Sequence, residues 1–259
     1  MSHHIDELLE GAAAQGELGA SSLQALQVDN DYGAQIEKGM GLTPEDVPSA
    51  EVVLVTLMPD DSGSIRFAGN SQAVCDGHNQ VIDALGSSKQ QADVLVHNRY
   101  LNGSVLYPYT RVGSAVAMDG QNYDPNQGTP LYDQMVVLLG TVLAKTQEFE
   151  DCGVPVRSVT LIITDGGDCS SRRQSAATVR PIVEDMLRSE RHIVAAMGID
   201  DGQTDFCEVF REMGIRDEWI LLPGNSASEI RAAFQVFSQS AVNVSQGAQL
   251  SAPATAIWN

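Results

Sequence analysis

Asp60, Ser62 and Ser64 stand at alternate positions in LMPDDSGSIRF (57–67), and these residue types at this spacing are suited to holding a cation. A loop that leaves a strand and tightens at Gly63 can direct the three side chains toward one point. The simpler alternative is a polar turn that ends a buried strand, because Asp, Ser and Gly are the commonest turn residues. This segment alone does not decide between a turn and half of a metal site.

Two further polar positions complete a set of oxygen ligands. Thr129 precedes the apolar stretch in QGTPLYD, and Asp165 follows the run SVTLIIT in TDGGD. Each has an ordinary explanation, since Thr before Pro130 is a common helix opening and Thr-Asp-Gly is a common turn. Together, two carboxylates and three hydroxyls make the shell that a hard divalent cation prefers, so we expect Mg²⁺, or alternatively Mn²⁺ or Ca²⁺. The set contains no His or Cys, so zinc is not expected.

The sequence patterns of the segments that would position these residues predict an α/β fold. Near-continuous apolar runs, typical of strands buried on both faces, occur at 51–58, 158–164, 192–199 and 218–222. Helical periodicity fills the intervals at 71–87, 130–150, 174–190 and 226–242. Asn102-Gly103 predicts a hairpin that adds one antiparallel strand at an edge. We therefore expect a three-layer, doubly wound, Rossmann-like sheet that is mostly parallel with one antiparallel edge strand.

The three polar clusters fall at one edge of this predicted sheet. In open parallel sheets the carboxyl ends of the strands carry the ligand crevice. The 57–67 segment and Asp165 each follow a predicted strand, and Thr129 immediately precedes a buried helix. This ordered combination is far more specific than any of its parts.

The motifs together resemble those of the von Willebrand factor A (vWA) domain family. DDSGSI is similar to the family's D-x-S-G-S, GTPLYD to its G-T-P-L-Y-D, and TLIITDGGD to its strand ending in T-D-G. The likeness covers roughly 51–243 and implies a vWA domain of the intracellular, bacterial type. Carried over residue by residue, it implies a metal-ion-dependent adhesion site (MIDAS) whose ligands are Asp60, Ser62, Ser64, Thr129 and Asp165. In this family an acidic residue of a partner, or water, takes the open coordination position.

The resemblance implies a non-enzymatic protein-interaction module. Its partner would supply an Asp or Glu to the metal, and an AAA+ ATPase or another component of a multi-protein assembly is the kind of partner implied. Two alternatives stay open, a Mg²⁺-dependent hydrolase or phosphotransferase on the same type of sheet, and a metal-free scaffold. Catalysis has little support, because the sequence contains no haloacid-dehalogenase D-x-D, no P-loop and no G-x-S-x-G elbow. His78, His97 and His192 are expected to be core or solvated residues rather than ligands.

Charge and composition limit which classes of partner and which cellular location are expected. A formal net charge of −19 over 259 residues repels nucleic acid phosphates and anionic lipid, so neither is an expected partner. No basic segment followed by a long apolar run opens the chain, and no apolar stretch reaches the roughly 18 residues of a membrane span. These features favour a cytoplasmic location, in which the four widely spaced cysteines are free thiols.

The sequence divides into three parts. We expect an N-terminal extension and linker at 1–50 with one short helix at 5–14, a vWA domain at 51–243, and a flexible C-terminal tail at 244–259. Two local expectations concern the first motif. Met58-Pro59 predicts a longer or bent loop before Asp60, and Asp61, out of register with the two serines, is expected to face solvent.

Overall fold

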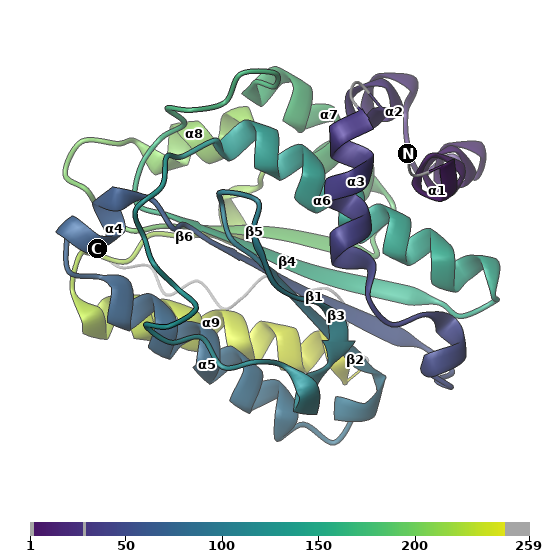
Figure 1. The fold of residues 1–259 in the computed structure, drawn as a ribbon, viewed down its shortest axis with the longest axis horizontal. Coiled ribbons are helices and arrows are strands. Elements are labelled where there is room, and N and C mark those ends of the chain that lie inside the picture. Colours follow the sequence, from purple (N-terminus) through teal and green to yellow (C-terminus); the bar gives the residue numbers. More distant parts are fainter. Residues whose placement is uncertain (1–2, 28–29, 247–259) are drawn as a thin grey trace.

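A computed structural model describes residues 3–27 and 30–246, and within them the chain forms a six-stranded sheet (Figure 1). The order along the sheet is β3-β2-β1-β4-β5-β6, and all neighbouring pairs are parallel except β2 and β3. The predicted mostly parallel sheet with one antiparallel edge strand is therefore confirmed. The strands are β1 (Val52–Pro59), β2 (Val94–Arg99), β3 (Val105–Arg111), β4 (Val156–Thr164), β5 (His192–Gly198) and β6 (Ile220–Leu221).

Helices cover both faces of the sheet, which gives the three layers (Figure 1). One face carries α5 (Ser71–Gly86) and α9 (Ala227–Ser245). The other carries α1 (His3–Ala14), α2 (Ala20–Gln27), α3 (Asn30–Met40), α6 (Leu131–Asp151) and α7 (Ala176–Arg188). Shorter helices are α4 (Gly63–Phe67), α8 (Phe206–Glu212) and the 3-10 turns Pro44–Asp46, Gln91–Asp93, Val112–Ser114 and Asp217–Trp219. Within the described residues no helix combines the length and apolar character needed to cross a membrane.

The first forty residues hold more structure than the sequence indicated. One helix was expected there, whereas the described residues of this segment form three, and α1 and α3 pack on α6 while α2 packs on α7. Helix α6 is buried around almost its whole circumference, as expected for a helix with apolar residues on nearly every side. The sheet covers only one side of α6, so α1 and α3 cover the other, with Ile5, Leu9 and Ile36 almost fully buried. The division of the chain at residue 51 stays a prediction.

Two buried cations hold α3 and the residues after it. Lys145 of α6 is fully buried, pairs with Glu148 and donates to the carbonyl of Leu42 at 2.8 Å. Arg99 at the end of β2 is also fully buried and donates to the carbonyl of Gln35. Because a buried charge without polar partners is costly, these contacts make the N-terminal segment part of the folded unit.

The packing of α5 against α9 depends on the absence of a side chain at Gly77. A Cβ there would lie 2.0 Å from the ring of Phe234, whereas a Cβ at Gly86, in the last turn of the same helix, would meet only Val112 at 3.6 Å. Gly77→Ala is therefore expected to lower the free energy of unfolding by about 1–3 kcal/mol through overpacking. Gly86→Ala should be neutral or stabilising by up to about 1 kcal/mol, because alanine favours helix. Equal urea midpoints for the two variants would contradict this account of the interface.

His78, His97 and His192 occupy the buried positions expected of structural residues, whereas Cys75 alone of the four cysteines is buried. Burial lowers the pKa of His78 to about 4 and the pKa of His97 and His192 to about 3, so all three are neutral at pH 7. All four cysteines are free thiols, and Cys75 is buried in the core.

Candidate metal centre

The loop that carries the first motif is short and direct. Strand β1 runs unbroken through Met58 to Pro59, and the amide of Asp60 still donates to the carbonyl of Ile163 at 2.8 Å. The expectation of a longer or bent loop is therefore wrong. Ladder pairing of β1 with β2 ends at Leu57, so the missing N–H of Pro59 removes no bond from that ladder.

Four of the five predicted ligands form one hydrogen-bonded chain across the ends of β1 and β4. Asp60 accepts the amide of Ser62 at Oδ1, at 2.7 Å. The hydroxyl oxygens of Ser62 and Ser64 lie 2.8 Å apart, and the Ser64 hydroxyl donates to Oδ1 of Asp165 at 2.7 Å. The alternate spacing thus directs both serine side chains from the first loop toward the second carboxylate.

Thr129 is brought to this edge through the main chain around it. The amide of Gln127 donates to the carbonyl of Asp61 at 3.0 Å, and the amide of Gly63 donates to the carbonyl of Gln127 at 3.1 Å. The carbonyl of Thr129 in turn accepts the amide of Cys169 at 3.1 Å. Helix α6 begins at Leu131, with Pro130 rather than Thr129 as its N-cap. The N-cap explanation of Thr129 is therefore wrong, and its 5% exposed side chain is not used to open the helix.

The two carboxylates are buried without a neutralising cation. Asp60 is 0% exposed and Asp165 is 4% exposed, and in the described part of the chain no Lys or Arg forms an ion pair with either. Burial raises the pKa of Asp60, and burial raises the pKa of Asp165 to about 6 although the Ser64 hydrogen bond opposes the shift. A divalent cation would remove this cost, so the donor set fits a hard metal ion.

Any cation held here would depend on hydroxyl oxygens. Residues 3–27 and 30–246 contain no group of three or more His, Cys, Asp or Glu side chains placed to hold a metal ion. The cluster at this edge offers two carboxylates together with neutral oxygens. This composition is typical of sites for Mg²⁺, Mn²⁺ or Ca²⁺.

Asp61 does not face solvent, so that expectation is wrong. Its side chain is 3% exposed, and Oδ1 accepts the amide of Asn102 at 3.0 Å. The turn between β2 and β3 covers it, and burial raises its pKa to about 7. The contact joins residues 41 positions apart, which a local pattern does not reveal.

Three residues that the sequence analysis did not assign to the site support it. The Thr164 hydroxyl donates to Oδ2 of Asp60 at 2.7 Å, and the buried Tyr123 hydroxyl donates to the carbonyl of Asp60. The Asp133 carboxylate accepts amides of the loop after Asp165. The only sequence signal for Thr164 is its place beside Asp165 in Thr-Asp-Gly.

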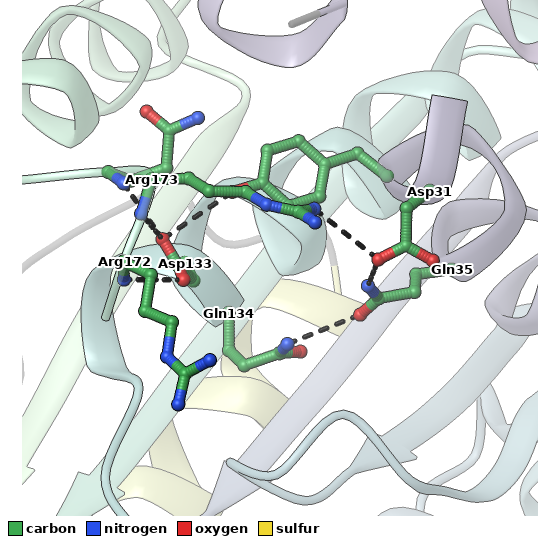
Figure 2. Close-up of polar contacts among 8 residues, drawn as sticks. Asp31, Gln35, Asp133, Gln134, Arg172 and Arg173 are labelled. Carbon is green, nitrogen blue, oxygen red and sulfur yellow. Dashed lines mark hydrogen bonds and ion pairs between the residues drawn. The ribbon is translucent and has the colours of Figure 1, made fainter. Parts of the chain in front are cut away.

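Asp133 connects this edge with the N-terminal helices (Figure 2). It accepts three successive main-chain amides, those of Arg172, Arg173 and Gln174, at distances of 2.9, 3.1 and 2.8 Å. The next residue, Gln134, donates to Gln35 of α3 at 3.2 Å, as Figure 2 shows. This acidic residue in the first turn of α6 therefore also fixes the loop that follows β4.

Thr164→Val tests whether the Asp60 orientation matters. The variant removes the donor to Oδ2 of Asp60 and should weaken divalent-cation binding by about 10–100-fold in calorimetry. Thr160→Val on the same strand is the matched control, because the buried Thr160 hydroxyl has no hydrogen-bond partner. Thr160→Val should bind metal like the wild type. Similar losses in both variants would show that strand packing, not orientation of Asp60, sets the affinity.

Solved structures share this fold at low sequence identity. The pilus adhesin SpaC from Lactobacillus rhamnosus GG, in an open conformation, has 14% identity and a TM-score of 0.54, over 75% of this chain and 30% of that chain. The vWF domain of the type V pili tip protein Mfa5 from Porphyromonas gingivalis has 9% identity and a TM-score of 0.54, and the match covers 78% of this chain and 97% of the Mfa5 chain. Proximal thread matrix protein 1 from the mussel byssus, with a zinc-occupied MIDAS motif, has 14% identity and a TM-score of 0.54. That match covers 74% of this chain and 46% of the mussel chain.

These likenesses concern the fold. This chain spans less than half the length of the SpaC and mussel chains that it matches. No protein-family model matches the sequence, and a comparison with curated proteins found no match.

Proposed function

We propose that this chain, which has the von Willebrand factor A fold, is a non-enzymatic protein-interaction module that recognises an acidic residue of a partner through a bound divalent cation. Asp60, Ser62, Ser64, Thr129 and Asp165 would hold the cation. The observation that carries the proposal is the hydrogen-bonded chain from Asp60 to Asp165, which places two buried carboxylates and two hydroxyls together at the carboxyl edge of the sheet.

Mg²⁺ is the proposed ion, with Mn²⁺ and Ca²⁺ as alternatives. Hydroxyl and carboxylate oxygens suit hard cations, and the predicted ligands include no nitrogen or sulfur donor. The mussel protein nevertheless holds zinc at its MIDAS motif, so zinc belongs among the ions to be compared. Calorimetry with each ion at pH 7.5 establishes the order of affinity.

An acidic partner residue suits such a cation because a carboxylate is a strong oxygen ligand for a divalent ion. The net charge of −19 opposes an acidic partner at long range, but salt screens that repulsion beyond about 8 Å at physiological ionic strength. Recognition would therefore depend on the local contact with the metal. A component of a multi-protein assembly, such as an AAA+ ATPase, is the proposed partner in a cytoplasmic setting. The pilus proteins among the compared structures make adhesion outside the cell the alternative setting.

A capture experiment tests the function. The immobilised chain is incubated with an extract in Mg²⁺ or in EDTA, alongside an Asp165→Ala variant. We expect partners that are retained only by the wild type and only in Mg²⁺. Partners recovered equally well in EDTA would place the interaction on another surface. Turnover of a phosphoester panel that requires Mg²⁺ and disappears in Asp60→Ala would instead favour the hydrolase alternative, and absence of metal binding would favour the scaffold.

Metal binding is expected to weaken as the pH falls through about 6. Burial raises the pKa of Asp165 to about 6, so above this pH the carboxylate is ionised and below it protons compete with the metal. The apparent affinity should fall by up to about tenfold per pH unit for each proton displaced. The measurement is the difference in Tm between Mg²⁺ and EDTA at pH 7.5, 6.5 and 5.5.

The comparison at each pH isolates the site from other groups. In the metal-free fold, Asp165 has a raised pKa, so this group adds stability as the pH falls from about 6 toward its unfolded value. The buried histidines act in the opposite sense, because their folded pKa values are lowered and acid favours the unfolded chain below about pH 6.5. The histidine contribution cancels in the difference between Mg²⁺ and EDTA, whereas the Asp165 contribution remains, because the metal and the proton compete for that carboxylate. A metal-dependent Tm shift that stays constant from pH 7.5 to 5.5 would contradict the prediction.

A further inference from the structure

An exposed aromatic side chain stands beside the predicted metal ligands. Helix α4 has five residues, of which Ser64 contributes to the polar cluster and Ile65 is fully buried. Phe67, at the end of the same helix, is 83% exposed, the highest value among the exposed large hydrophobic residues of the described chain. A single exposed apolar residue is normal on a protein surface, so what distinguishes Phe67 is its position beside the candidate binding site.

The ring of Phe67 lies against the loop that carries the first motif. A Cβ added at Gly63 would be 3.4 Å from Cε2 of Phe67, in ordinary van der Waals contact with the ring. Gly63 separates Ser62 and Ser64, the two predicted hydroxyl ligands of this loop. The ring is thus placed directly beside the cluster, and the absence of a side chain at Gly63 leaves it close to the main chain.

Arg66 supports the ring and adds a positive charge. Its guanidinium carbon is 5.4 Å from the centroid of the Phe67 ring, and it donates to Oδ1 of Asn126 at 2.9 Å. Asp124 lies 4.0 Å from the guanidinium, and both partners belong to the loop that leads to Thr129. The Arg66 side chain remains 46% exposed. We call these two side chains the Arg66–Phe67 ridge.

We propose that the Arg66–Phe67 ridge is a specificity-determining surface, which selects a partner segment carrying a large apolar residue within two positions of its metal-binding Asp or Glu. The inference rests on the proposed function, because the contact of the acid with the metal brings the segment against the ridge. Phe67 offers apolar area for such a side chain to bury, and aromatic residues and Arg dominate the binding energy of many interfaces. The charge of Arg66 complements an acidic segment and locally opposes the negative surface of the chain.

Selection from a random heptapeptide display library tests the inference. The library is bound to the wild-type chain in Mg²⁺, and bound members are released with EDTA. We expect enriched peptides to contain Asp or Glu together with Leu, Ile, Met, Phe or Trp within two positions. The same selection on Phe67→Ala should retain the acidic residue and lose the apolar preference. Leu222→Ala, which removes another exposed apolar residue, is the matched control and should retain both.

The experiment distinguishes failure of the Arg66–Phe67 ridge from failure of metal-dependent recognition. A peptide enriched on the wild type is then synthesised, and we expect Phe67→Ala to weaken its binding about tenfold. Enrichment of acidic peptides with no apolar preference, or with an equal preference on Phe67→Ala, overturns the ridge and leaves metal-dependent recognition intact. Absence of any EDTA-released acidic peptide overturns the proposed function and the ridge with it. Calorimetry with Mg²⁺ on Phe67→Ala establishes that the metal site is present in the variant.

Discussion

Asp165→Asn is expected to abolish Mg²⁺ binding and, in EDTA, to make the protein more stable than the wild type. The two effects have one cause. Burial raises the pKa of Asp165 to about 6, so at pH 8 the metal-free fold must hold an ionised carboxylate in an unfavourable environment close to Asp60. The amide oxygen of Asn preserves an acceptor for the Ser64 hydroxyl but carries no charge for a metal.

Thermal unfolding in EDTA and in Mg²⁺ measures both effects. At a Mg²⁺ concentration one hundred times the dissociation constant, the wild type should gain about 2.7 kcal/mol of stability, and Asp165→Asn should gain nothing measurable. Asp124→Asn is the control, because it changes the net charge equally and its side chain is 81% exposed. A variant that is less stable in EDTA, or that keeps the Mg²⁺-dependent gain, would show that Asp165 is a structural residue rather than a ligand.

A chain that begins at residue 51 is expected to lose cooperative folding. Removing α1, α2 and α3 uncovers the outer side of α6, which is buried around almost its whole circumference, and removes the carbonyl partners of Lys145 and Arg99. The exposed apolar surface and the loss of a carbonyl acceptor from each of these two cations both destabilise the remainder. We expect the shortened chain to bind a hydrophobic dye and to show no sharp thermal transition.

A single substitution in α3 tests the same packing of the N-terminal helices with a smaller change. Ile36 of α3 is fully buried and lies close to Gly140 of α6, so Ile36→Ala should lower the free energy of unfolding by about 2–5 kcal/mol. Glu37→Ala, at the exposed neighbouring position, should change it by less than about 0.5 kcal/mol. A shortened chain that unfolds sharply, together with a small effect of Ile36→Ala, would show that residues 51–259 fold without the N-terminal helices.

Contacts at the start of α6 also connect the N-terminal helices with the candidate site. Asp133 fixes the loop after β4 through three amides, and the neighbouring Gln134 contacts Gln35 of α3. The segment before residue 51 therefore touches the same helix turn that follows Thr129. Variants in α3 should accordingly be checked for metal affinity as well as for stability.

The sequence by itself determined the sheet and the residue types at its edge. Apolar runs of strand length identify β1, β4 and β5, because the period of hydrophobicity is a local property of the chain. The Asn102-Gly103 turn identified the antiparallel hairpin for the same reason. The chemistry of the candidate site was also readable, since oxygen-bearing residues after parallel strands must meet at one edge.

Only the tertiary structure decided which neighbours those residues have. The burial of Asp61 under Asn102 and the donation from Thr164 to Asp60 join residues 41 and 104 positions apart. The N-terminal helices are short, at 12, 8 and 11 residues, and α6 and α7 are the surfaces that bury them. The position of the Phe67 ring beside Gly63 and under the Arg66 guanidinium likewise depends on how α4 leaves its loop. Local sequence sets periodicity and turn chemistry, whereas contacts between distant segments form only when the layers pack, because burial and hydrogen bonding across the chain outweigh local preference.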